Sequence, residues 1–163
     1  MKKFGTLFTL LLLAVVTSYG QSPKSPRVTS DGKLASVSYG QPSKRGRDIF
    51  GTLEPYGKVW RTGANDATEI TFKKDVQFGG KPVKAGTYTL FTIPTEKEWT
   101  IILNGVTGQF GAFDYDKNKA KDVLSVKVPI HKLTEVVEKL TITPEDNALK
   151  IAWDKTSVSI PMK

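Results

Sequence analysis

The sequence predicts an all-β fold: an antiparallel β-sandwich, jelly-roll-like or closed into a flattened barrel, with one long ordered loop. Apolar and polar residues alternate in short runs along most of the chain, and this period of two is typical of half-buried strands. Turn signals rich in Gly, Pro and Asn separate the runs, as they do in sandwiches and barrels. Only residues 130–138 could carry a helical turn, and the chain shows no internal repeat.

Residues 1–20 have the pattern of a cleavable signal peptide. Lys2 and Lys3 precede a short apolar run over residues 4–16, and small residues lead up to a cleavage point after Gly20. The apolar run is shorter than the roughly 20 residues that a membrane-spanning helix needs. We therefore expect an exported protein, periplasmic or extracellular, that does not span the membrane.

Removal of the signal peptide from the 163 residues leaves 143, enough for one domain with one core. We expect an extended linker with two prolines over residues 21–30 and a single β-sandwich domain over residues 31–163. The formal net charge is +8, and export makes anionic glycans or lipid headgroups the expected neighbours, with no role for nucleic acid. The absence of Cys excludes disulfides and thiolate metal sites.

The expected strands follow one another with short connections on either side of one long loop. The strands at residues 33–39 and 68–72 alternate strictly between apolar and polar side chains. Gly79 and Gly80 form the turn of a two-residue hairpin, in which Pro82 marks an edge strand because proline cannot donate to a ladder. The other strands are expected at residues 75–78, 81–83, 86–93, 99–104, 124–128, 140–142, 149–153 and 158–162.

The long loop lies within residues 39–72. Loops of this length are uncommon in compact domains unless they carry function or are disordered. Its apolar side chains indicate that it is ordered: Phe50, Leu53, Tyr56, Val59 and Trp60. A phosphate-binding loop is excluded, since five residues rather than four separate its glycines and Val59 stands in place of the hydroxyl ligand.

Residues 60–66 have the composition of a ligand-binding segment. Trp60 offers a flat apolar face, and Arg61 offers a fixed charge. Asn65 and Asp66 add hydrogen-bonding groups, which gives a mixture typical of sites for polar ligands or sugars. A structural role is the alternative, with Arg61 paired to Asp66 or Glu69, Trp60 in the core and Asn65 at a turn.

Arg45 and Arg47 lie earlier in the same loop, within a run of three cations. A guanidinium group is a planar fork that fits a carboxylate or a phosphate, so both are candidate anion contacts. Pro42 and Gly46 would hold this turn in a defined shape. A solvated turn is the alternative.

Few residues offer metal or triad chemistry. His131 is the only histidine and no G-x-S-x-G elbow accompanies it, so we expect neither a zinc site nor a Ser-His-Asp triad. Residues 114–118 begin like a calcium loop, but Lys119 and Ser125 stand where Gly and Glu are required. We expect no metal and no cofactor.

Three long motifs carry a family resemblance. YGQPSKRGRDIFG, PYGKVWRTGAN and AGTYTLFTIP resemble the signature of DUF2911, a secreted bacterial family without an established activity. Residues 109–113 (QFGAF) are similar to a GQWGAF-like run of that family. The resemblance extends over residues 25–162 and implies one β-rich exported domain. The resemblance suggests no catalytic residue in this sequence, because the family has no established activity.

We expect a binding module for a polar or anionic, glycan-like ligand rather than an enzyme. The candidate binding residues are Trp60, Arg61, Asn65, Asp66, Arg45 and Arg47. A second hypothesis is a hydrolase of an envelope glycan or ester that uses Asp66 or Glu69 as acid or base. A third is a structural or assembly partner that uses the sheet edge near Pro82.

Overall fold

The computed structural model describes residues 25–163, so the expected signal peptide and the first part of the expected linker lie outside the described residues. The all-β prediction is confirmed, since strands dominate and the helical elements are short. In chain order the elements are β1 (Arg27–Asp31), β2 (Ala35–Gly40), β3 (Thr68–Phe72), β4 (Val76–Phe78), β5 (Lys81–Val83), β6 (Gly86–Pro94), β7 (Glu98–Asn104), α1 (Tyr115–Asn118), the 3-10 turn η1 (Lys119–Lys121), β8 (Asp122–Pro144) and β9 (Ala148–Pro161). No helix among these residues is long and apolar enough to cross a membrane.

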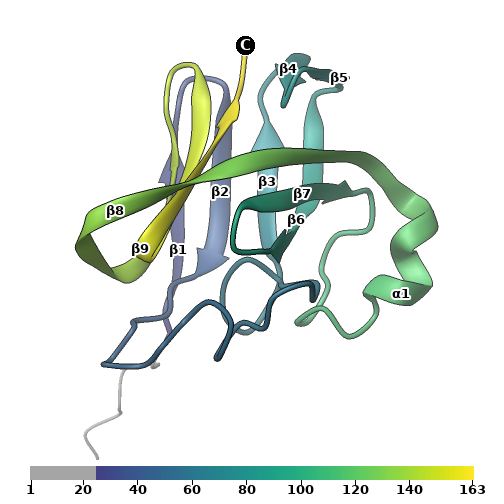
Figure 1. Ribbon diagram of the computed structural model, residues 1–163. Helices are drawn as coiled ribbons and strands as arrows, with labels where there is room; N and C mark the ends of the chain where they lie inside the picture. The colour runs from purple at the N-terminus through teal and green to yellow at the C-terminus, as the bar shows by residue number, and fades with distance from the viewer. Residues whose placement is uncertain (1–24) are drawn as a thin grey trace, which may run out of the picture.

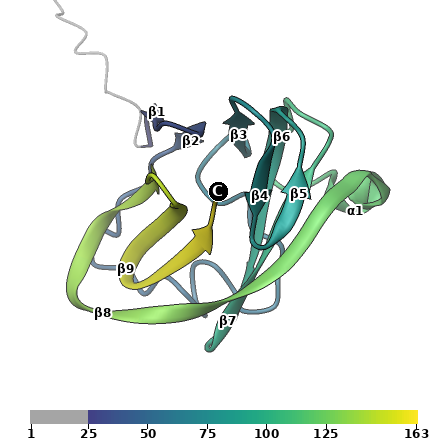
Figure 2. The same ribbon diagram turned by 90° about the horizontal axis from the view of Figure 1, so that it is seen from above.

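Seven strands form one antiparallel sheet in the order β1-β2-β3-β6-β7-β8-β9, and the hairpin β4-β5 forms a small second sheet. Seen from above, the large sheet curls into a half-barrel, with the long strand β8 sweeping along one side (Figure 2). Because neighbours in the sheet are mostly neighbours in sequence, short turns suffice to connect them. Three connections are longer: the long loop from β2 to β3, the β4-β5 hairpin between β3 and β6, and the segment with α1 and η1 between β7 and β8.

The core lies inside this curl and follows the predicted alternation. Val37 of β2 and Ile70 of β3 are opposite one another in the sheet and are fully buried. The core's largest fully buried side chains come from four strands and are Trp99, Trp153, Phe72 and Phe78, while Phe91 belongs to a second, smaller cluster with Ile102 and Tyr115. Burial of this much apolar surface is the main favourable term for a domain that has no disulfide.

β8 and β9 differ from the prediction, because each joins two of the expected strands into one. Residues 130–138 belong to β8 rather than to a helical turn, and the described helix begins at Tyr115 instead. Register shifts interrupt the β8-β9 ladder between Lys132 and Val137, and Asp154 adopts a left-handed φ of 53° within β9. Bulges bend a strand without ending it. They also break its period of two, so the sequence alone suggests separate strands.

The edge strand β1 also differs from the prediction, because it occupies part of the expected linker (residues 21–30). It pairs along its whole length with β2, from Arg27 opposite Gly40 to Asp31 opposite Ser36. None of its side chains is fully buried. Ladder hydrogen bonds and one apolar contact, from Val28 to the core, therefore hold it, and a single apolar residue leaves no periodic signal in the sequence.

The long loop is ordered, as predicted, and crosses the lower end of the half-barrel in Figure 1, opposite the β4-β5 hairpin. Its end returns to its beginning, because the Ala64 amide donates to the Gly40 carbonyl at 3.1 Å. A Cβ at Gly40 would lie 2.0 Å from the Ala64 carbonyl oxygen, so only glycine permits this approach. The loop is thus a closed cover over one end of the sheet.

Candidate functional site

Trp60 anchors the loop to the core. Its backbone makes an antiparallel bridge with Thr92 of β6, with N–O distances of 2.7 and 3.0 Å. Its indole is only 3% exposed and lies in a cluster of four aromatic rings. The Trp60 and Trp153 rings stack with centroids 5.9 Å apart, and Phe50 meets Trp99 edge-to-face at 4.9 Å. The floor of the loop is therefore rigid.

A cavity of about 230 Å³ lies above this floor. Most of its wall comes from the long loop, and one residue comes from β9. The lining residues are Ser25, Pro42, Arg47, Leu53, Glu54, Arg61, Gly63, Ala64, Asn65 and Trp153. Two arginines and one glutamate thus line a small volume.

Arg61 is half-buried in this wall. Its Nε is one of two fully buried side-chain nitrogens or oxygens without a hydrogen-bond partner within residues 25–163, and the other is Nε1 of Trp99 in the aromatic cluster. A buried donor without an acceptor is unfavourable by about 1–3 kcal/mol. The position of Arg61 is fixed by its backbone, because its carbonyl accepts from Thr68 N at 3.1 Å. The guanidinium is thus held at the cavity, and its Nε–H makes no hydrogen bond within the protein.

Glu54 faces these cations, and its pKa is raised from 4.5 to about 7. Burial is the dominant cause, because it disfavours the carboxylate form. The charges of Arg61 and Arg47 lower the pKa, but they do not cancel the effect of burial. The carboxyl of Glu54 therefore exchanges its proton near neutral pH, which changes the charge of the cavity.

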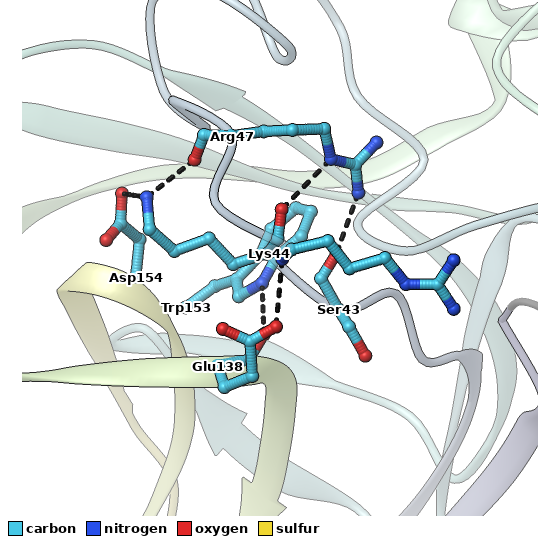
Figure 3. A network of polar contacts seen from close by, with 7 residues as sticks. Ser43, Lys44, Arg47, Glu138, Trp153 and Asp154 are labelled. Atoms are coloured by element: carbon cyan, nitrogen blue, oxygen red, sulfur yellow. Dashed lines mark hydrogen bonds and ion pairs between the residues drawn. The ribbon is translucent and has the colours of Figure 1, made fainter.

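Arg47 is held by the turn to which it belongs. Its guanidinium folds back and donates from Nε to the Lys44 carbonyl at 3.0 Å and from Nη2 to the Ser43 carbonyl at 2.7 Å (Figure 3). These bonds occupy two of its five N–H groups, and the remainder of the fork is available at the cavity wall. The prediction of a shaped turn is therefore accurate for this arginine.

Lys44 connects the same turn to β8 and β9. Its ammonium group makes an ion pair of 3.0 Å with Asp154, and its amide donates to the Glu138 carbonyl at 2.7 Å (Figure 3). The Trp153 indole donates to that carbonyl as well, at 3.2 Å. Both charged side chains of the pair are mostly buried, so their contact is worth more than a surface pair. The network fixes the Arg47 side of the cavity to the sheet.

Left-handed backbone conformations concentrate round the cavity. Within residues 25–163 the non-glycine residues with positive φ are Arg45, Thr62, Asn65 and Asp154. Asn65 lines the cavity, Thr62 lies between two lining residues, and Asp154 follows the lining residue Trp153. Thr62 is fully buried with a φ of 56°, which is unusual for a β-branched residue. Strain of this kind clusters at ligand clamps and active sites.

Arg45 lines a neighbouring hollow of about 360 Å³ together with Ser25, Ser43 and Arg47. Ser25 and Arg47 belong to both linings, so the two hollows adjoin. The backbone of Arg45 is fixed, because its amide donates to the Glu138 carboxylate at 2.8 Å. Arg45 thus extends the charged surface beside the cavity.

The structure brings together Arg47, Arg61 and Asn65 but separates the other candidates. Trp60 is a core residue, so its expected role as an exposed apolar face is wrong and the structural alternative holds. Asp66 is not part of the cavity wall and pairs with Arg27 of β1 at 4.0 Å. Asn65 also donates to the Ser25 carbonyl, at 3.3 Å.

The two carboxylates considered for glycoside cleavage have separate structural partners. Asp66 pairs with Arg27, and Glu69 accepts a hydrogen bond from the Gly108 amide at 2.8 Å. None of the ion pairs within residues 25–163 joins Arg61 to either of them, so the alternative pairing is not observed. Within the same residues no group of three or more acidic or histidine side chains is placed to hold a metal ion.

Sequence reasoning missed Glu54 and Trp153 as wall residues. Glu54 is the only acid in residues 49–65, and it stands between Leu53 and Pro55 in a loop that carries three arginines. This is a weak signal, since Asp48 and Asp66 stand directly beside that range in the same loop. Trp153 left no comparable signal, because its place in the wall depends on the fold of β9.

The comparisons with known proteins give a family and nothing more. The family described as "Protein of unknown function (DUF2911)" matches residues 22–162. No curated protein and no solved structure matches the chain. Because the match covers nearly the whole chain, the resemblance of the motifs is confirmed. The chain belongs to the DUF2911 family.

Proposed function

We propose that this protein is an exported binding module whose cavity takes the carboxylate of an acidic sugar. The observation that carries the proposal is Arg61, a half-buried guanidinium with an unpartnered buried Nε within the described residues. Charge-assisted hydrogen bonds between a guanidinium and a carboxylate are short and strong. A ligand carboxylate in the cavity would pair with the charge of this guanidinium, which lies in the wall.

The composition of the wall supports a polar ligand over an apolar one. Arg47 and Arg61 supply fixed positive charge, while Glu54 and Asn65 offer groups that can bond to hydroxyls. The volume of about 230 Å³ is below the range of about 300–1,000 Å³ typical of drug-sized ligands. A single sugar unit suits a cavity of this size.

Binding is favoured over hydrolysis by the count of acids. Most glycoside hydrolases use a pair of carboxyl groups. The lining of the cavity contains Glu54 as its one carboxyl group among the described residues. A pKa of about 7 would suit a proton donor, but no second carboxylate is placed to act with it.

The proposed location rests on residues 1–20, whose sequence has the form of a signal peptide. An exported module would meet the acidic sugars of envelope or extracellular glycans. The surplus of basic residues, +8 over the whole sequence, favours the approach of such anions.

Calorimetric titration with galacturonate and with galactose tests the proposal, because the two sugars differ in one carboxylate. At low ionic strength we expect heat of binding for galacturonate only, since screening by salt weakens exposed contacts. Arg61→Met should weaken binding about 10- to 100-fold, because a charged hydrogen bond contributes roughly 1.5–3 kcal/mol. Lys58→Met removes one charge from the same loop outside the cavity wall and is the matched control. Equal binding of both sugars, or unchanged binding by folded Arg61→Met, would refute the proposal.

A further inference from the structure

Phe110 and Phe113 lie on the loop between β7 and α1 with unusually high exposure. Their exposed fractions of 62% and 79% are the highest of any large apolar side chain in residues 25–163. The two rings are nearly parallel, with an interplanar angle of 19° and centroids 6.2 Å apart. That separation exceeds face-to-face contact of about 3.5–4.0 Å between carbons, so the rings are offset and leave apolar surface open.

The backbone holds this pair of rings in place. Phe110 bridges to Asp66, and two hydrogen bonds flank it: from the Ala67 amide to the Gln109 carbonyl at 2.9 Å and from the Gly111 amide to the Asn65 carbonyl at 3.0 Å. Aromatic rings on a freely moving loop would lose conformational entropy when a ligand fixes them. Rings that are already fixed lose less entropy on binding.

Gly111 positions the second ring. It has a left-handed φ of 64°, and a Cβ at this position would lie 2.7 Å from the ring of Phe113. The ring therefore rests against the bare backbone of a glycine. A larger residue would displace the ring, so the turn presents Phe113 in one orientation.

The segment of the aromatic pair is joined to the charged cavity through Asn65. Asn65 lines the cavity, and its carbonyl accepts the hydrogen bond from Gly111. The β7-α1 loop and the long loop lie at the same end of the half-barrel (Figure 1). A chain of sugars that extends from the cavity past Asn65 would run toward the segment that carries Phe110 and Phe113.

We propose that Phe110 and Phe113 form an aromatic platform that stacks on a second sugar ring, so that the protein binds an acidic oligosaccharide rather than a lone sugar. The proposal rests on the proposed function, because it extends the site of Arg61. One face of a sugar ring carries C–H groups, and such a face suits the surface of an aromatic ring. The small cavity holds one unit, and the platform takes the next.

The charges around the platform favour a sugar over a membrane surface. Interfacial membrane binding combines apolar residues with a strongly basic face. Next to the platform three acids accompany three lysines: Asp114, Asp116, Asp122, Lys117, Lys119 and Lys121. Lys117 is moreover paired with Asp114 at 2.9 Å. No basic face accompanies the rings in this segment, whereas a sugar needs none.

Titration with tetragalacturonate and with galacturonate tests the platform on the full chain. A tetramer gains about fourfold over the monomer merely because it offers more copies of the unit, so we expect a gain well above fourfold in the wild type. Phe110→Ala and Phe113→Ala should each lower tetramer affinity about 3- to 10-fold, as an aromatic contact of roughly 0.5–1.5 kcal/mol predicts, and leave galacturonate affinity unchanged. Val136→Ala removes an exposed apolar side chain on β8 and is the control.

The outcomes separate the platform from the cavity. A tetramer gain that persists in the Phe110→Ala/Phe113→Ala double variant overturns the platform and leaves the cavity standing. Tetramer binding that needs the phenylalanines but survives Arg61→Met supports the platform and overturns the proposed function. If neither sugar binds to the wild-type protein, both are overturned.

Discussion

Glu54→Gln should make the protein more stable above neutral pH. The pKa of Glu54 is about 7 in the folded state against 4.5 in its ordinary state, so between these values the folded protein binds more protons than the unfolded chain. The free energy of unfolding therefore falls as pH rises through this window. A shift of about 2.5 units would correspond to about 3.4 kcal/mol at 1.36 kcal/mol per unit. Because the side chain is only partly buried, screening reduces this to about 1–2 kcal/mol.

Urea unfolding, followed by tryptophan fluorescence across the pH range, measures this difference. The variant minus wild-type stability should be near zero below pH 4.5, where the glutamate is protonated in both states. It should rise with pH and level off above about pH 8 in favour of the glutamine. If ion pairing with Arg61 and Arg47 dominated instead, the variant would lose stability at high pH. A flat or inverted difference would therefore refute the argument that burial controls this carboxyl.

Three further outcomes follow from the site. Trp60→Ala should destabilise the fold by about 3–5 kcal/mol in urea unfolding, because it empties the centre of the aromatic cluster. Asp154→Asn and Asp154→Val both remove the ion pair with Lys44. Asparagine tolerates the left-handed φ at this position, whereas valine adds about 1–2 kcal/mol of backbone strain, so the valine variant should be the less stable of the two. Galacturonate binding at about pH 7 should take up roughly half a proton, because a bound carboxylate drives the half-protonated Glu54 to its neutral form. Calorimetry in buffers of different ionisation enthalpy measures this uptake.

The sequence could predict those parts of the fold that depend on local patterning. Alternation identified β2 and β3 with their buried faces, and the diglycine turn identified the β4-β5 hairpin. The sequence also predicted that the long loop is ordered, because Phe50 and Trp60 are too apolar to remain in water. Elements without a local pattern were missed: β1 is held by ladder hydrogen bonds, and β8 is continuous only through its bulges.

The candidate site could be predicted only as a set of residue types. Arg47, Arg61 and Asn65 were identified because their side chains suit anions and hydroxyls. The course of the chain beside Arg61 depends on Thr62, whose left-handed φ of 56° turns it between Arg61 and Gly63. A β-branched residue is among the least expected in this conformation, so no sequence rule would place the turn there. The wall residue from β9 is likewise brought in by the fold.

Unfavourable terms concentrate around one cavity, and this is the strongest reason to regard it as functional. Within the described residues, Arg61 Nε is buried without an acceptor, Glu54 is a carboxyl whose charged form burial disfavours, and Thr62 is strained. Arg61 and Glu54 are only partly buried, so substitutions there could relieve their costs without emptying the core, whereas Thr62 is fully buried and bonds to Thr92. Proteins tolerate such costs where activity requires them. A purely structural cover would need only the anchors, Phe50 and Trp60, and a neutral wall above them. An anion in the cavity, as proposed above, would give the charges of Arg61 and Glu54 a partner, whereas Arg47 already holds its own turn.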